Sequence, residues 1–137
     1  MKKLLVILFV VLFFSPSHVK AGPIGSGELK LEPFLVDYFI KYIQGEEGNK
    51  PDRFFILNNG ESAWYIFCKH SQCQPGGDRA DIIWCENTTK NDCKIFAKGR
   101  TIKWSNGINK GNKDSRFKSK WSDSEMKAKL KELGFLD

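Results

Sequence analysis

Four cysteines, Cys68, Cys73, Cys85 and Cys93, constrain the fold of this 137-residue chain more than any other feature. An even number of cysteines in a small exported protein is typical of a disulfide framework. Three pairings are possible, and the sequence alone does not choose among them. We expect Cys68 to pair with Cys73 and Cys85 with Cys93, because both bridges close short loops beside turn-forming residues. Each bridge should stabilise the fold by about 2–4 kcal/mol.

The N-terminal segment predicts export. Two lysines precede an unbroken apolar run over residues 4–14, and a polar stretch then ends at Ala21. This order is typical of a secretory signal peptide that is cleaved after a small residue. A helix over the apolar run would be about 16 Å long, too short to cross a hydrocarbon core of about 30 Å. We therefore expect a signal peptide over 1–21, no membrane span after cleavage, a flexible leader over 22–30 and one domain over 31–137.

Other cysteine chemistry does not fit these spacings. Structural zinc sites use pairs of closely spaced cysteines, and only the Cys68 and Cys73 pair approaches that pattern. A thioredoxin-like redox site requires Cys-x-x-Cys, which this sequence does not contain. His70 is the only histidine left once the signal peptide is removed, and we expect it in a surface turn. The sequence therefore predicts no metal and no cofactor.

Motifs for catalysis are also scarce. The chain has no Gly-x-Ser-x-Gly nucleophile elbow and no phosphate-binding loop, and a single histidine cannot form a catalytic pair. We therefore predict no catalytic residue. Glycan hydrolysis needs only two carboxylates, so it stays open as an alternative. The unspecific candidates for it are Glu28, Glu32, Glu46, Glu47, Asp78, Asp81 and Glu86.

Sequence periodicity predicts three helices. Apolar residues recur at helical spacing after Pro33, which suits a first helical turn, and predict a mostly buried helix over 33–44. Ser122 and Glu125 match the capping box and place the start of a terminal helix over 123–133. A further helix is expected over 79–88.

That middle helix and the strands around it complete the predicted domain. Ala80, Ile83 and Trp84 are expected to face the core from the helix. Two runs rich in aromatic and β-branched residues, 53–57 and 63–68, flank an Asn-Asn-Gly turn. They predict a β-hairpin that is central in the sheet and covered on both faces.

Strand character resumes after the fourth cysteine, with a bend at Gly99. The sequence thus predicts an α+β fold in which an antiparallel sheet of three to four strands is packed by about three helices and stapled by two disulfides.

Positive charge is concentrated in one stretch of the chain. Residues 94–121 carry a net charge of +8, whereas residues 22–93 carry −4. Residues 105–121 are poor in apolar residues, so we expect a long exposed loop there. The ordinary interpretation is that lysines solvate an edge strand and discourage aggregation. The functional interpretation is contact with an anionic partner, for which the candidates are Lys98, Arg100, Lys103, Lys110, Lys113, Arg116, Phe117, Lys118, Lys120 and Trp121.

Four aromatic residues lie within this basic stretch. We expect Phe96 and Trp104 in the core, and Phe117 and Trp121 in contact with a partner. Outside the cytoplasm, the expected partners are an anionic glycan, a lipid headgroup or an acidic protein surface, and nucleic acid is not expected.

Residues 80–104 contain a pattern that is formed by Ala80, Cys85, Glu86, Thr89, Cys93, Lys94, Ile95, Phe96, Ala97, Gly99, Arg100, Ile102 and Trp104. This pattern resembles a short cysteine-containing module of small exported bacterial proteins of unknown function. In such modules a helix that carries one cysteine precedes a strand that begins with another. The resemblance implies a Cys85–Cys93 bridge and no activity.

The sequence as a whole favours a periplasmic or secreted bacterial protein that binds a partner without catalysis. The alternatives are a cell-envelope hydrolase that acts on glycans through carboxylates, and a secreted effector, toxin or inhibitor.

Overall fold

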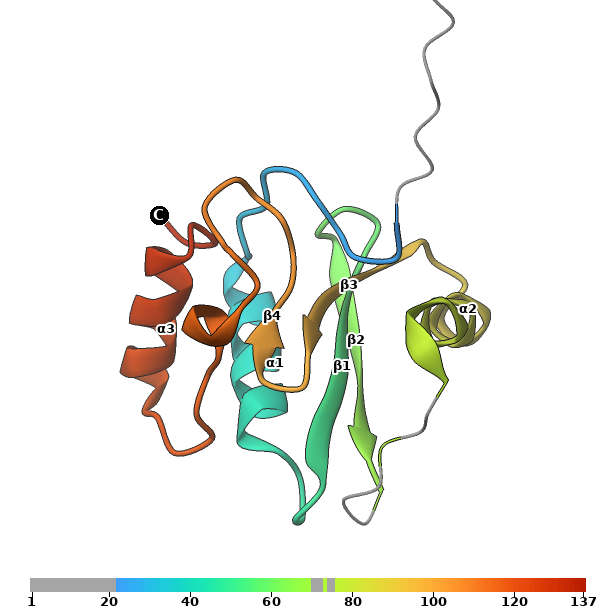
Figure 1. The fold of residues 1–137 in the computed structure, drawn as a ribbon, viewed down its shortest axis with the longest axis horizontal. Coiled ribbons are helices and arrows are strands. Elements are labelled where there is room, and N and C mark those ends of the chain that lie inside the picture. Colours follow the sequence, from blue (N-terminus) through green and yellow to red (C-terminus); the bar gives the residue numbers. More distant parts are fainter. Residues whose placement is uncertain (1–21, 70–72, 74–75) are drawn as a thin grey trace, which may run out of the picture.

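A four-stranded antiparallel sheet lies between helices on both of its faces (Figure 1). The structure is a computed structural model and describes residues 22–69, 73 and 76–137. Two helices cover one face of the sheet and a third covers the other. The elements in chain order are α1 (Pro33–Gln44), β1 (Lys50–Leu57), β2 (Ser62–Cys68), α2 (Gly77–Thr89), β3 (Cys93–Lys98), β4 (Thr101–Ile102), the 3-10 turn η1 (Lys113–Ser115) and α3 (Asp123–Glu132). The predicted α+β class and its two disulfides are confirmed.

The sheet order is β2-β1-β3-β4, so the predicted hairpin of β1 and β2 is present but is not central as a whole. Its turn residues Asn58, Asn59 and Gly60 all have positive φ, as a tight connection requires. β1 pairs with a strand on each side and is buried along most of its length. Among the described residues, β2 pairs with β1 alone, and it is mostly half-exposed, so the prediction of a hairpin covered on both faces holds for β1 and is wrong for β2.

The helices α1 and α3 lie on the same face of the sheet, and their ends follow the sequence signals (Figure 1). Pro33 occupies the first turn of α1, and Gly45 ends it with φ of 82°. Ser122 and Glu125 form the reciprocal capping box at the start of α3.

Aromatic side chains fill the core on this face. The Phe39 ring lies 5.3 Å from the rings of Phe54 and Phe96 and 5.2 Å from that of Phe117, each in an edge-on arrangement. Such edge-to-face pairs add stabilisation beyond the burial of apolar area. Phe39 therefore joins α1, the two central strands and the loop over 105–121, which we call the basic loop, in one packed cluster.

The helix α2 covers the opposite face, but not with the predicted side chains. Ile83 and Trp84 are 53% and 48% exposed, and Ala80 is also exposed. The buried residues of α2 are Asp81 and Cys85. The prediction failed because it assigned the inner face by apolar content, whereas the helix is oriented by a disulfide and by ion pairs.

Both predicted disulfides are present. Cys68 is bonded to Cys73, and Cys85 is bonded to Cys93. The second bridge joins α2 to the start of β3, so it holds the helix against the sheet. Predictions for the signal peptide over 1–21 and for His70 lie outside the described residues.

Residues 22–30 do not form the free leader that their composition predicts. Ile24 and Ile95 form a parallel bridge, and Gly27 donates a backbone hydrogen bond to Ser105 at 2.8 Å. The Trp104 indole donates a hydrogen bond to the Gly27 carbonyl at 2.8 Å. The segment crosses the end of the sheet before α1 begins (Figure 1). It is part of the domain, and its glycines permit this close contact.

The loop over 105–121 is mostly exposed, as predicted, but a buried polar network anchors it. Asn109 donates hydrogen bonds to the carbonyls of Ile102 and Trp104, and Ser115 donates one to the Asn109 side chain. Phe117 is only 1% exposed, which contradicts its prediction as a contact residue. Phe96 and Trp104 are buried as predicted.

In the part of the chain that the structure describes, no helix is long and apolar enough to cross a membrane.

We predict that Gly25→Ala destabilises the fold, because the new Cβ would overlap the Trp104 ring. Forced overpacking of this kind typically costs about 1–3 kcal/mol in the free energy of unfolding, measurable by urea denaturation. Gly22→Ala is the matched control, since nothing lies within 4 Å of its added Cβ. Equal stability of the two variants would show that residues 22–30 do not pack against the domain.

Candidate functional site

A cluster of charged residues links α2 to the sheet. Arg53 on β1 lies at its centre: its Nη1 is 2.8 Å from Asp52 Oδ1, and its Nε is 3.1 Å from Asp81 Oδ2. Its Nη2 is 3.6 Å from Asp78 Oδ1, and Lys98 Nζ lies 2.8 Å from the same oxygen. The Arg53 and Asp81 contact is an ion pair only, because Nε makes no aligned hydrogen bond among the described residues.

The local backbone explains how these side chains meet. The register of β1 against β2 shifts between Pro51 and Arg53, and this irregularity leaves Asp52 as the extra residue on the strand. Asp78 and Asp81 are three residues apart, so they share one face of α2. Three carboxylates and two cations thus hold α2 to the ends of β1 and β3.

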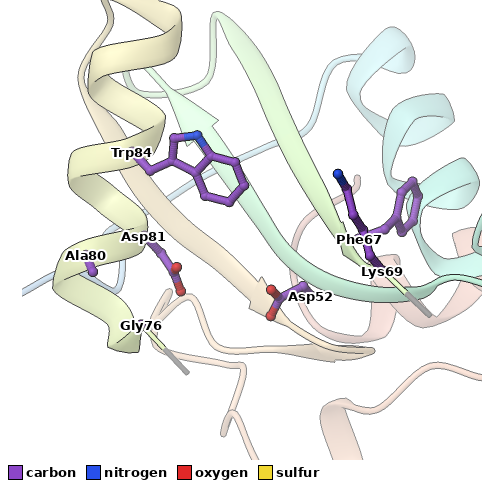
Figure 2. A pocket seen from close by; sticks show the side chains of 7 residues that line it. All are labelled: Asp52, Phe67, Lys69, Gly76, Ala80, Asp81 and Trp84. Atoms are coloured by element: carbon purple, nitrogen blue, oxygen red, sulfur yellow. The ribbon is translucent and has the colours of Figure 1, made fainter. Parts of the chain in front are cut away.

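A cleft of about 500 Å³ opens beside this cluster (Figure 2). Asp52 and Asp81 lie on its floor from the two sides, and the Trp84 ring projects from α2 toward the strands. The remaining lining residues are Phe67, Lys69, Gly76 and Ala80. The cleft therefore combines buried carboxylates with a half-exposed aromatic wall.

The two carboxylates on the cleft floor have perturbed protonation. Burial raises the pKa of the Asp52 carboxyl, and the Arg53 guanidinium partly opposes that rise. Burial also raises the pKa of Asp81, which Arg53 lowers and the neighbouring Asp52 and Asp78 raise further. Both carboxyls therefore bind protons more tightly in the folded state than in the unfolded state. As a result, their protonation increases the free energy of unfolding as the pH falls toward 3.8, the ordinary pKa of an aspartate.

The cleft offers no metal centre of the usual kind. Among the described residues, one group of potential ligand atoms lies close together, namely Asp52, Cys68 and Cys73. The two sulfurs of this group are bonded to each other in a disulfide, so no thiolate is free to bind a metal ion.

A second candidate site lies at the far side of the sheet, around the basic loop. A shallow depression of about 520 Å³ is lined by Arg100, Lys113, Arg116, Phe117, Lys118, Ser119 and Lys120. Five of these residues are basic and none is acidic. Four of the basic side chains, those of Lys113, Arg116, Lys118 and Lys120, are exposed. We call this surface the basic depression.

Two anchors position the basic depression. Arg100 Nε donates a hydrogen bond to the Ile43 carbonyl at 2.9 Å, and the Phe117 amide donates one to the Arg100 carbonyl at 2.7 Å. Phe117 therefore forms the floor by packing inward. Among the described residues, no carboxylate forms an ion pair with the four exposed cations.

The structure separates the other predicted contact residues from this surface. Lys98 is paired with Asp78 on the α2 side, and Lys103 donates a hydrogen bond to the Gly111 carbonyl at 2.6 Å. Lys110 lines a different hollow beside α3, and Trp121 stacks edge-on against Phe117 at 5.6 Å. The charged stretch of the sequence therefore contains more residues than the basic depression gathers.

The sequence interpretation missed Asp52 and Arg53. A signal for them was present, since an acid and a base sit side by side directly before the apolar residues 54–57 of β1. Charged residues in a buried strand are rarely tolerated unless they are paired, so the pair indicated a buried ionic contact.

Comparison of the chain with protein-family models, with curated proteins and with solved structures gave no match. The resemblance of residues 80–104 to a small exported module therefore stays a prediction.

We predict that Arg53→Met destabilises the fold by about 3–5 kcal/mol at neutral pH, because Asp52 and Asp81 would be left buried without a countercharge. The loss should shrink as the pH falls, since protonation of the two carboxyls removes the uncompensated charges. Urea denaturation at neutral and acidic pH measures both effects.

Arg79→Met is the matched control, because Arg79 is an exposed arginine of α2 that forms no ion pair with another described residue. Its stability should stay within about 0.5 kcal/mol of the parent chain. A destabilisation of Arg53→Met that is small, or that does not depend on pH, would contradict the assigned role of the cluster.

Proposed function

We propose that this chain is exported and binds an anionic glycan at the basic depression, without catalysis. The observation that carries the proposal is the gathering of four exposed cations, Lys113, Arg116, Lys118 and Lys120, around one hollow that no acidic residue lines. Unpaired cations at a concave surface attract anionic groups, and adjacent cations reinforce each other. The two disulfides support export, because such bonds persist in oxidising compartments.

The composition of the basic depression favours a glycan over the other anionic partners. Insertion into a lipid surface requires exposed apolar side chains, but Phe117, the aromatic residue of the lining, is buried. The cores of protein interfaces are enriched in aromatic residues and depleted in lysine, whereas three lysines line this hollow. A polymer that carries carboxylate or sulfate groups fits such a surface without apolar contacts.

We predict that Lys118→Glu combined with Lys120→Glu weakens binding to heparin and to polygalacturonate about tenfold or more. Exposed charge contacts contribute roughly 0.5–1 kcal/mol each, and reversal adds repulsion. Binding of the parent chain should also weaken steeply between low and physiological salt. Isothermal titration calorimetry over a salt series measures both effects.

The matched control is Arg79→Glu combined with Lys90→Glu, which makes the same change in charge on α2 and at the residue that caps its C-terminus, on the opposite side of the sheet (Figure 1). This control should bind like the parent chain. An equal loss of glycan affinity in both variants would show that binding depends only on the net charge of the protein. If the parent chain bound anionic vesicles or acidic proteins but no glycan, the proposed glycan binding would be wrong and the partner would be a lipid or a protein.

Glycan hydrolysis in the cleft of Figure 2 is a second candidate, favoured by two carboxylates whose pKa values are raised by burial. The pairing of both groups with Arg53 opposes it, because a carboxylate held by a guanidinium is a poor nucleophile or base. Turnover of a cell-wall glycan that Asp52→Asn or Asp81→Asn abolishes would establish this function. We expect no turnover by the parent chain.

A further inference from the structure

The outer edge of β2 is open. In the order β2-β1-β3-β4, Ser62–Cys68 forms the first edge of the sheet, and β1 is its partner. Among the described residues, no backbone group bonds to the other side of this strand. The strand has seven residues and spans about 23 Å. A row of backbone donors and acceptors of that length is ready to pair with another strand.

Nothing in the sequence of β2 discourages such pairing. Its residues, SAWYIFC, include no charged side chain and no proline. Natural proteins usually protect an exposed edge with lysine, proline or a very short strand. The opposite edge of this sheet has that protection: β4 has two residues, and Thr101 forms a bridge to Arg116 of the basic loop. The β4 edge of the sheet is therefore protected against pairing with another strand, whereas the β2 edge is not.

Exposed apolar side chains flank the open edge on both faces of the sheet. Five large hydrophobic residues are exposed in the described part of the chain, and four of them, Phe34, Tyr38, Ile83 and Trp84, lie on α1 and α2. The Tyr38 ring lies 6.2 Å from that of Tyr65 on β2, and the Trp84 ring lies 5.4 Å from that of Trp64. We call these four residues, together with Trp64 and Tyr65, the β2 rim.

We propose that two copies of this chain pair antiparallel through β2, so that their sheets join into one continuous eight-stranded sheet. A two-fold axis through Tyr65, the middle residue of the strand, relates the copies. The interface is then isologous, as in most homodimers. The sheet of each copy supplies four strands to the whole.

This register places compatible side chains opposite each other. Trp64 of one copy faces Ile66 of the other, and both lie on the α2 face. Ala63 faces Phe67, and both lie on the α1 face. Aromatic residues opposite β-branched or small residues stabilise cross-strand pairs, and no like charges meet because the strand has none.

A second copy fits this edge better than a foreign extended segment does. A single added strand would pair with the edge but would leave Phe34 and Ile83 on the helices uncovered. A two-fold axis perpendicular to the sheet brings the second α1 to the face of the first α1, and likewise for α2. Each copy therefore supplies apolar side chains that cover the β2 rim of the other, while the basic depression at the far edge stays free.

Sedimentation equilibrium over a concentration series of the oxidised exported protein tests the proposal. We expect a monomer–dimer equilibrium in the parent chain. Tyr38→Lys combined with Trp84→Lys should raise the dimer dissociation constant at least tenfold, because two charges would enter an apolar interface. Both parent side chains are more than two-fifths exposed, at 42% and 48%, so the variant should fold. Tyr65→Lys changes the strand itself and should also give monomers.

Ile108→Lys combined with Ala128→Lys is the matched control, since it adds the same charge at exposed positions away from β2. The control should dimerise like the parent chain. A parent chain that stays monomeric at every concentration would overturn the proposal, whether or not it binds an extended peptide. The proposal would also be overturned if the variant with Tyr38→Lys and Trp84→Lys dimerised as tightly as the parent chain.

Discussion

The central strand β1 is buried on both faces, so the fold requires cover on both sides of the sheet. The two covers are unequal. On one side, α1, α3 and the basic loop pack an extensive core around Phe39. On the other side, a smaller apolar cluster around Phe55 and Ile95 is covered by α2, and Ile24 of the N-terminal segment also packs against it. Because α2 presents few apolar residues inward, the Cys85–Cys93 bond and the Arg53 ion pairs supply what hydrophobic burial does not.

The sequence predicted those features that local rules determine. Local signals predicted the ends of several elements to within a residue or two, because each signal meets a specific backbone requirement. These signals are Pro33, the Asn-Asn-Gly turn and the Ser122 capping box. The short loops between cysteines indicated both disulfides. The predictions failed where long-range contacts decide. Gly25 packs against Trp104, seventy-nine residues away in the chain, and no local pattern encodes that contact.

At the candidate site, too, the sequence predicted what local composition determines and failed where long-range contacts decide. The charge run in the sequence contains Lys113, Arg116, Lys118 and Lys120, which line the basic depression, but it did not separate them from Lys98 and Lys103, which the folded chain uses for internal contacts. Phe117 was misassigned because a lone aromatic residue in a polar loop resembles a contact residue, whereas here it anchors that loop to Phe39. Whether a cation faces solvent or an internal partner depends on the tertiary fold.

The molecule thus carries distinct surfaces at its two sheet edges. The basic depression lies beyond β4, the open strand β2 forms the other edge, and the Asp52 and Asp81 cleft lies between α2 and the sheet. Occupation of one edge leaves the other accessible. The proposed glycan binding and the proposed pairing through β2 are therefore compatible, and each stands without the other.

Amide hydrogen exchange of the oxidised protein and of the Cys85→Ser, Cys93→Ser double variant tests whether α2 is held by its bridge and ion pairs rather than by the main core. We expect the amides of α2 to lose protection in the variant while those of α1, β1 and α3 keep theirs. Unchanged protection of α2, or an equal loss throughout the domain, would contradict it.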